Sequence, residues 1–284
     1  MADNYLERKM EEYRNGGTRQ RPRHTTPMAG ARPGHMDVKF APRRVFVTGG
    51  ANGIGRSIVT QLRNVGCKVA FCDVDCEAGT ELARSCGAQF HPLDVCDTSS
   101  LVQAMDKVFR AWGDIDVVIN NVGISEFKSL EEITIKEFDR VMAINVRPVF
   151  VTAHTLLRHR VKLPYPNSYG GRIINISSTR SRMSEPGTEA YSASKGAVSS
   201  LTHALMMSLA PYHITVNSIS PGWIVTDSEQ PLRDIDHMQH PSGRVGRPED
   251  VARICLFLMI DDNDFINGED ICVDGGMTRR MIYQ

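Results

Sequence analysis

The feature that most constrains this chain is the segment VFVTGGANGIG, residues 45–55, which holds glycines at 49, 50, 53 and 55. An apolar run precedes the glycines, and a run with helical spacing comes after them. Glycine destabilises regular structure by about 0.5–1 kcal/mol relative to alanine, so this density indicates a place that excludes side chains. A strand that runs into a helix leaves unpaired N–H groups that favour an anion. The segment therefore predicts a tight turn, either plain or shaped for a pyrophosphate.

The rest of the chain alternates short apolar runs with segments of helical spacing. Continuously apolar strands are typical of a sheet that is covered on both faces. We expect strands at 44–49, 68–73, 88–94, 116–121, 171–177, 214–220 and 270–275, and helices at 53–65, 99–112, 133–159, 190–210 and 248–259. This alternation predicts one α/β domain, a doubly wound seven-stranded parallel sheet with helices on both faces. The segment 163–171 is typical of a surface loop.

Residues 1–43 differ in character from the rest of the chain and form a predicted N-terminal extension, partly disordered or docked on a surface, before a catalytic domain at 44–284. Residues 4–17 could form a short helix. An appendage is one interpretation, and a targeting arm or an RNA-binding scaffold is the other. The net charge of zero and the pI of about 7.1 argue against a nucleic-acid partner. The scattered seven cysteines indicate a reducing, cytoplasmic location without a metal site, and no apolar run is long enough for a membrane.

Two further patterns concern the choice of cofactor and a candidate acid/base. Asp73 ends the second predicted strand, where a carboxylate can accept hydrogen bonds from the adenosine ribose and repel a 2′-phosphate, so NAD is favoured over NADP. Tyr191 and Lys195 lie four residues apart, on one face of a predicted helix. A nearby cation lowers the pKa of a phenol, which makes Tyr191 a candidate acid/base. Ser178 ends a buried strand 13 residues before Tyr191.

With these motifs, residues 44–276 resemble the short-chain dehydrogenase/reductase family, in its single-domain branch of about 250 residues with a Rossmann-like fold. The resemblance rests on TGGANGIG, NNVG at 120–123, Asn145 in MAINV, NISS at 175–178, YSASK at 191–195, SPGW at 220–223 and GRVGRPEDVA. The usual NNAG is NNVG here, a mild departure. Family members are usually tetramers or dimers, so the resemblance implies a homotetramer or a homodimer.

The resemblance also implies roles for individual residues. Ser178 hydrogen-bonds the substrate oxygen, Tyr191 passes the proton, Lys195 holds the nicotinamide ribose and lowers the Tyr191 pKa, and Asn145 steadies a water. Asn145 could instead be a helix-kink residue, and Thr226 an ordinary helix cap. The implied cofactor site consists of Gly49, Asn52, Gly53, Ile54, Gly55, Asp73, Asp94, Val95, Asn121, Gly123, Tyr191, Lys195, Pro221, Gly222, Ile224 and Thr226. The implied substrate contacts are Ser178, Arg180, Tyr191 and Trp223.

These residues predict an NAD-dependent oxidoreductase that interconverts a secondary alcohol and its ketone. The alternatives are an NADPH-dependent 3-ketoacyl reductase and a non-catalytic NAD-sensing protein. Charged residues near the predicted pocket, including Arg180, Glu185 and those of the short lid at 228–243, favour a small polar substrate such as a polyol, sugar or sugar acid.

Overall fold

The computed structural model describes residues 40–163, 167–226 and 231–281. Within these residues, seven parallel strands form one sheet in the order β3-β2-β1-β4-β5-β6-β7. The predicted doubly wound parallel sheet is therefore confirmed, and each predicted strand is present. The strands are β1 (Arg44–Thr48), β2 (Lys68–Asp73), β3 (Gln89–Pro92), β4 (Val117–Asn120), β5 (Gly171–Ile176), β6 (Ile214–Pro221) and β7 (Asp270–Val273).

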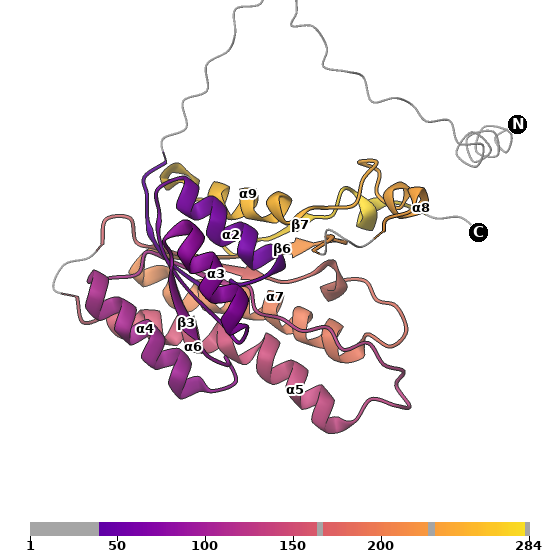
Figure 1. Cartoon of the computed structure of the whole chain (residues 1–284), viewed down its shortest axis with the longest axis horizontal. Coiled ribbons are helices and arrows are strands. Elements are labelled where there is room, and N and C mark those ends of the chain that lie inside the picture. Colours follow the sequence, from indigo (N-terminus) through magenta and orange to yellow (C-terminus); the bar gives the residue numbers. More distant parts are fainter. Residues whose placement is uncertain (1–39, 164–166, 227–230, 282–284) are drawn as a thin grey trace, which may run out of the picture. The chain divides into compact units, whose positions relative to one another are not determined.

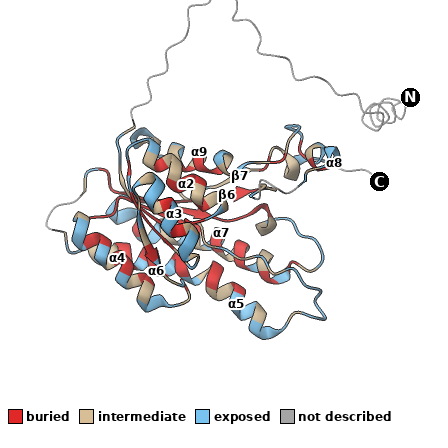
Figure 2. Cartoon of the chain, in the orientation of Figure 1, coloured by how far each residue is buried: buried red, intermediate tan, exposed pale blue. Residues whose placement is uncertain are grey.

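Helices cover both faces of the sheet (Figure 1). One face packs against α2 (Gly53–Asn64), α3 (Cys76–Cys86) and α9 (Pro248–Leu258). The other packs against α4 (Thr98–Trp112), α5 (Ile135–Asn145), α6 (Arg147–Arg160) and α7 (Glu189–Leu209). The short helix α8 (Asp234–Met238) and four 3-10 turns, η1 (Thr179–Ser181), η2 (Ala210–Tyr212), η3 (Asp261–Asn263) and η4 (Met277–Arg279), complete the described elements. Buried residues concentrate on the sheet and on the helix faces toward it, while exposed residues lie outside (Figure 2).

Local sequence explains where the helices begin and end. Asp75 caps α3 by accepting a hydrogen bond from the backbone N–H of Ala78, and Gly87 ends the helix in the left-handed conformation at φ 70°. Asp97 and Gly113 delimit α4 in the same way. The helix α3 is an addition to the predicted helices.

The predicted single helix over 133–159 is in fact two helices. α5 ends at Asn145 and α6 begins at Arg147. The cause is Pro148, which has no N–H to continue the helical pattern. The backbone N–H of Val149 bonds to the carbonyl of Val146 at 3.1 Å, so the carbonyl of Asn145 loses both of its ordinary helical donors.

The strand order reverses between β1 and β4, which lie side by side although two strands and three helices separate them in sequence. In such sheets the crevice outside the carboxyl ends of the strands at this switch point is the usual place for a ligand. The topology thus brings together the turns after β1, β2, β4, β5 and β6.

Most of the predicted N-terminal extension, including the helix expected at 4–17, lies outside the described residues. The described part before β1 packs against the domain. Phe40 contacts the core on the α2 side, and the backbone N–H of Arg43 donates to Cys67 Sγ at 3.4 Å.

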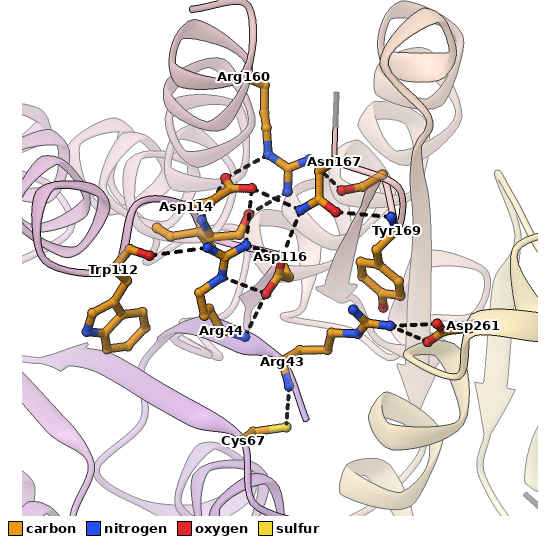
Figure 3. A network of polar contacts seen from close by, with 12 residues as sticks. Arg43, Arg44, Cys67, Trp112, Asp114, Asp116, Arg160, Asn167, Tyr169 and Asp261 are labelled. Carbon is orange, nitrogen blue, oxygen red and sulfur yellow. Dashed lines mark hydrogen bonds and ion pairs between the residues drawn. The ribbon is translucent and has the colours of Figure 1, made fainter. Parts of the chain in front are cut away.

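A polar network ties together the amino ends of the central strands (Figure 3). Arg44 Nη2 lies 2.7 Å from Asp116 Oδ1, Arg160 Nε lies 2.8 Å from Asp114 Oδ1, and Asn167 donates to both carboxylates. Arg160 and Asp114 are each only 6% exposed in their side chains. The network fixes the start of β1 against the end of α6.

The same region corrects one expectation. The segment 163–171 is not wholly a surface loop, because Tyr169 is buried and its hydroxyl donates to the carbonyl of Met259 at 2.9 Å. The guanidinium carbons of Arg43 and Arg172 lie over its ring, 3.7 and 4.3 Å from the centroid. Burial raises the pKa of Tyr169 to about 12.

Arg160→Met should lower the free energy of unfolding by about 3–5 kcal/mol, because it leaves the buried Asp114 without its closest cation. Arg158→Met on the same helix is the control, since Arg158 pairs with Asp106 while 41% exposed and should contribute less than about 1 kcal/mol. Guanidinium denaturation of both variants measures the difference. Equal losses would contradict a special role for the buried network.

Candidate active site

The glycine segment forms the turn from β1 into α2. Gly49 and Gly53 have φ values of 69° and 53°, which side chains rarely adopt. A Cβ at Gly55 would lie 1.8 Å from the carbonyl oxygen of Gly49, so the first turn of α2 packs directly on the turn. The backbone N–H groups of Gly49 and Gly50 donate to the carbonyl of Cys72 at 2.8 and 3.2 Å. The turn is thereby fastened to β2.

The amino end of α2 is open toward a cavity. Asn52 is the N-cap residue, but its side chain donates to Asp75 Oδ2 at 2.8 Å instead of capping the helix. Gly53 and Ile54 line the cavity with their first-turn backbone N–H groups available to an anion. The residues present therefore fit the pyrophosphate of a dinucleotide.

Asp73 lies at the tip of β2, beside this turn. Its Oδ2 accepts a hydrogen bond from the backbone N–H of Ala51 at 2.9 Å, and its Oδ1 accepts one from the backbone N–H of Asp75 at 3.1 Å. Each carboxylate oxygen has a second lone pair for a further donor. The carboxylate is thus oriented by the backbone and also lines the cavity, where it can accept from hydroxyl groups.

The cavity measures about 740 Å³, and its lining includes residues at the carboxyl ends of six strands, β1 to β6. Of the predicted cofactor residues, fifteen line it, all except Gly55, whose place is the helix packing described above. They are Gly49, Asn52, Gly53, Ile54, Asp73, Asp94, Val95, Asn121, Gly123, Tyr191, Lys195, Pro221, Gly222, Ile224 and Thr226.

Sequence reasoning missed some lining residues, namely Val74, Leu93, Val122, Ile124, Ser125, Arg140, Ile144, Ile176 and Ser177. Most of them adjoin a predicted residue in sequence and could have been found by extending each motif. Arg140 gave no such signal, because it reaches the cavity from the middle of α5 and forms an ion pair with Glu126.

Tyr191, Lys195 and Ser178 line one part of the cavity. Tyr191 and Lys195 come from the first turns of α7, and the Lys195 Nζ lies 5.6 Å from the centre of the Tyr191 ring. Ser178 lies just beyond the end of β5, and its hydroxyl is close enough to the phenol of Tyr191 to lower the pKa of that phenol. This arrangement places a hydroxyl donor, a phenol and an ammonium group at one wall.

Burial dominates the electrostatics of this wall. Burial raises the pKa of Tyr191 above its usual value, and the hydrogen bond from Ser178 and the charge of Arg180 oppose that rise. Burial also lowers the pKa of Lys195 to about 8. Its Nζ donates to the carbonyl of Ile176 at 2.8 Å, and a Cβ at Gly123 would lie 3.0 Å from it. The absence of a side chain at Gly123 therefore leaves room for the buried Lys195 ammonium at the wall of the cavity.

Asn145 contacts the cavity wall from behind. Its Oδ1 accepts from the backbone N–H of Ile124 at 2.8 Å, and its Nδ2 donates to the carbonyl of Ile124 and to Ser194 Oγ. The side-chain amide is therefore used in holding the loop after β4 against α7. The break between α5 and α6 leaves the backbone carbonyl of Asn145 without its helical donors.

Two asparagines at the end of β4 position the rest of the site. Asn121 Nδ2 donates to the carbonyl of Gly49 at 2.7 Å, which braces the glycine turn. Asn120 donates to Asn175 Oδ1 at 2.8 Å and accepts from Thr152, and Asn175 donates to Thr202. This buried chain of amides and hydroxyls joins α6, β4, β5 and α7, and so fixes the strand ends that carry the site.

The structure does not bring two predicted substrate residues into the cavity. Arg180 lies outside it because its guanidinium is paired with Glu185. Trp223 lies 6.4 Å from His240, ring to ring, and lines a separate cavity of about 200 Å³. In the described part of the predicted lid, residues 231–243, Arg233 is paired with Asp236, so these two charges face each other.

Over the described ranges, three or more His, Cys, Asp or Glu side chains nowhere cluster in a way that could hold a metal ion. A helix of the length and apolar character needed to cross a membrane is likewise not found in those ranges.

The fold and the cavity define a nucleotide-binding oxidoreductase. A family model described as enoyl-(acyl carrier protein) reductase matches residues 49–278. An uncharacterized oxidoreductase of Thermotoga maritima is 42% identical over 252 residues, covering 84% of this chain and 96% of that protein. Cyclopentanol dehydrogenase of a Comamonas species is 36% identical over 245 residues, covering 82% and 96%. A solved apo SCOR enzyme from Clostridium thermocellum is 37% identical with a TM-score of 0.77, covering 85% and 95%.

The chain belongs to the short-chain dehydrogenase/reductase family, whose members bind a nicotinamide cofactor.

The buried Lys195 generates a pH prediction. Folding lowers its pKa from 10.5 to about 8, so in that interval the folded chain has released a proton that the unfolded chain keeps. The free energy of unfolding of the wild type should therefore rise with pH, relative to Lys195→Met, by up to about 3 kcal/mol between pH 8 and 10.5. Lys136→Met, at an exposed position, should show no such divergence. Urea denaturation across this range makes the comparison, and parallel curves for wild type and Lys195→Met would refute it.

Proposed function

We propose that this protein is an NAD-dependent oxidoreductase that interconverts a secondary alcohol and its ketone. The observation that carries the proposal is the meeting of Ser178, Tyr191 and Lys195 in the cavity that begins at the open end of α2. A bound nicotinamide would supply hydride transfer at this wall. The chain itself would orient the substrate, move one proton and exclude water.

Each side chain has a role that its surroundings support. Ser178 would donate a hydrogen bond to the substrate oxygen. Tyr191, kept protonated at neutral pH by burial, would give its proton to that oxygen when a ketone is reduced, and take it back when an alcohol is oxidised. Lys195 is mostly cationic at pH 7 with a pKa of about 8, and its charge would stabilise the transient phenolate.

The backbone carbonyl of Asn145 extends this group. Because the helix break leaves it without its helical donors, it can hold a water between Lys195 and solvent. The side chain of Asn145 holds the loop in place and would serve the proton path only indirectly. Loss of this amide should therefore reduce activity through loop position.

The preference for NAD rests on Asp73. A 2′-phosphate at the tip of β2 would meet a carboxylate whose position two backbone N–H groups fix. The cationic side chains lining the described cavity are Arg140 of α5 and Lys195 of α7, and neither belongs to the turns after β1 and β2. Those turns thus offer hydrogen-bond acceptors and amides but no cation for NADP.

For the substrate we propose a small secondary alcohol. Arg180 is paired with Glu185 outside the cavity, and Arg233 with Asp236, so a charged substrate has less to pair with than the sequence indicated. The similarity to a cyclopentanol dehydrogenase is consistent with a small, weakly polar carbinol. A panel of cyclic alcohols, polyols, sugar acids and steroids, followed by NADH formation, tests this, and a preference for steroids or sugar acids would overturn it.

Tyr191→Phe should reduce kcat by about 10²–10⁴-fold, because the ring stays and only the proton carrier is lost. NADH affinity, measured by fluorescence titration, should change little. Ser192→Ala, on the next residue, is the control and should keep turnover near that of the wild type. If Tyr191→Phe retains more than half of the wild-type kcat, Tyr191 does not carry the proton, and a non-catalytic NAD-binding role for the site gains support.

The wild type should prefer NAD to NADP by at least about tenfold in kcat/KM, which corresponds to about 1.4 kcal/mol. Asp73→Ser should reduce this preference by removing the carboxylate. Asp97→Ser is a matched control, because Asp97 caps α4 away from the cavity and serine also caps helices. Equal use of both cofactors by the wild type would show that Asp73 does not reach the ribose, and would favour the NADPH-dependent reductase.

A further inference from the structure

Three side chains form a row behind the catalytic wall. The ring of Phe127, in the loop after β4, lies 5.8 Å from the ring of Tyr191 at an interplanar angle of 88°. The guanidinium carbon of Arg180 lies 5.9 Å from the centre of the Phe127 ring. Arg180 belongs to η1, two residues after Ser178, and its backbone N–H donates to Ser178 Oγ at 3.2 Å. The row therefore links a cation to the phenol of Tyr191, and its other two members, Arg180 and Phe127, do not line the cavity.

The Arg180 charge is partly cancelled by a carboxylate. Its Nη2 forms an ion pair with Glu185 Oε2. The two side chains differ in exposure, at 24% for Arg180 and 70% for Glu185. Solvent screens the carboxylate more than the guanidinium, so a net positive field remains on the Tyr191 side. Consistent with this, the charge of Arg180 lowers the pKa of Tyr191 against the larger effect of burial.

Other charged side chains near Phe127 and Tyr191 form contacts of their own or are exposed. Glu126 is paired with Arg140, and Lys128 with Glu137, which joins the loop around Phe127 to α5. On α7, Lys195 donates to the carbonyl of Ile176, and Glu189 at the start of the helix is exposed.

Arg180 and Glu185 do not line the cavity, so a substitution can change either charge without altering the cavity wall. Arg182, two residues further on, is a natural comparison. It pairs with Asp270 Oδ2 at 2.9 Å, away from Tyr191.

We propose that Arg180 is a positioning residue for Tyr191. From outside the cavity, Arg180 favours the ionised form of the Tyr191 phenol, and Glu185 limits this effect. The proposal rests on the proposed function of Tyr191 as the proton carrier. It differs from a direct substrate contact, because Arg180 acts on the phenol and not on the ligand. The pair would thus set the pH range in which the enzyme oxidises its alcohol.

The test is a titration of Tyr191 in the full chain, followed by tyrosinate absorbance as the difference between each protein and its own Tyr191→Phe counterpart. Arg180→Gln should move the midpoint up by about half a pH unit, and Glu185→Gln should move it down, because the lone guanidinium then acts unopposed. Arg180→Lys should restore most of the wild-type value. Arg182→Gln should leave it unchanged.

The pH profile of kcat/KM for alcohol oxidation should shift in the same directions. A midpoint that is the same in wild type, Arg180→Gln and Glu185→Gln would overturn the proposal, as would equal shifts with Arg182→Gln. Glu185 is exposed, so its variant keeps the test decisive if Arg180→Gln fails to fold. A raised KM for anionic substrates without any midpoint shift would instead make Arg180 a substrate contact. Because the absorbance titration needs no turnover, it tests the effect of Arg180 on Tyr191 even if the protein lacks the proposed activity.

Discussion

The structure depends on the close approach of Gly55 to the carbonyl oxygen of Gly49. A Cβ on residue 55 would lie 1.8 Å from that oxygen. That approach sets the angle at which α2 leaves β1, and it turns the open N–H groups of the helix toward the carboxyl ends of the strands. Asn121 holds the same carbonyl, and the backbone of Cys72 holds the turn from the other side. Asp73, Asn121 and the glycines are therefore parts of one rigid corner, and the cavity inherits its shape from that corner.

Burial and the groups that oppose it determine the pKa values at the cavity wall formed by Ser178, Tyr191 and Lys195. Parallel β5 and the start of α7 bring Ser178, Tyr191 and Lys195 together, and burial raises the pKa of the phenol while it lowers the pKa of the lysine to about 8, which still leaves the ammonium mostly charged at pH 7. The chain compensates with a hydrogen bond from Ser178 and with a cation behind Phe127. In this account, Ser178 at the cavity wall and Arg180 outside the cavity adjust the acidity that burial perturbs.

The fold could be predicted well from the sequence, because continuous apolar runs and glycine punctuation are local signals. The helix break at Asn145 was missed as a boundary because Pro148 lies in the first turn of the next helix, where proline is also compatible with a helix start. Lining residues next to a motif could be inferred from that motif. Three features could not be inferred in this way: the cavity-lining position of Arg140, the pairing of Arg180 with Glu185, and the position of Trp223. Packing between segments distant in the sequence decides where these side chains lie.

The most direct measurement of the central claim is a crystal structure of the full chain with NADH. The account predicts the pyrophosphate against the N–H groups of Gly53 and Ile54, the adenosine ribose hydroxyls on the Asp73 carboxylate, and the nicotinamide beside Tyr191. Cofactor bound at another place, or a ribose turned away from Asp73 with the nicotinamide distant from Tyr191, would contradict it.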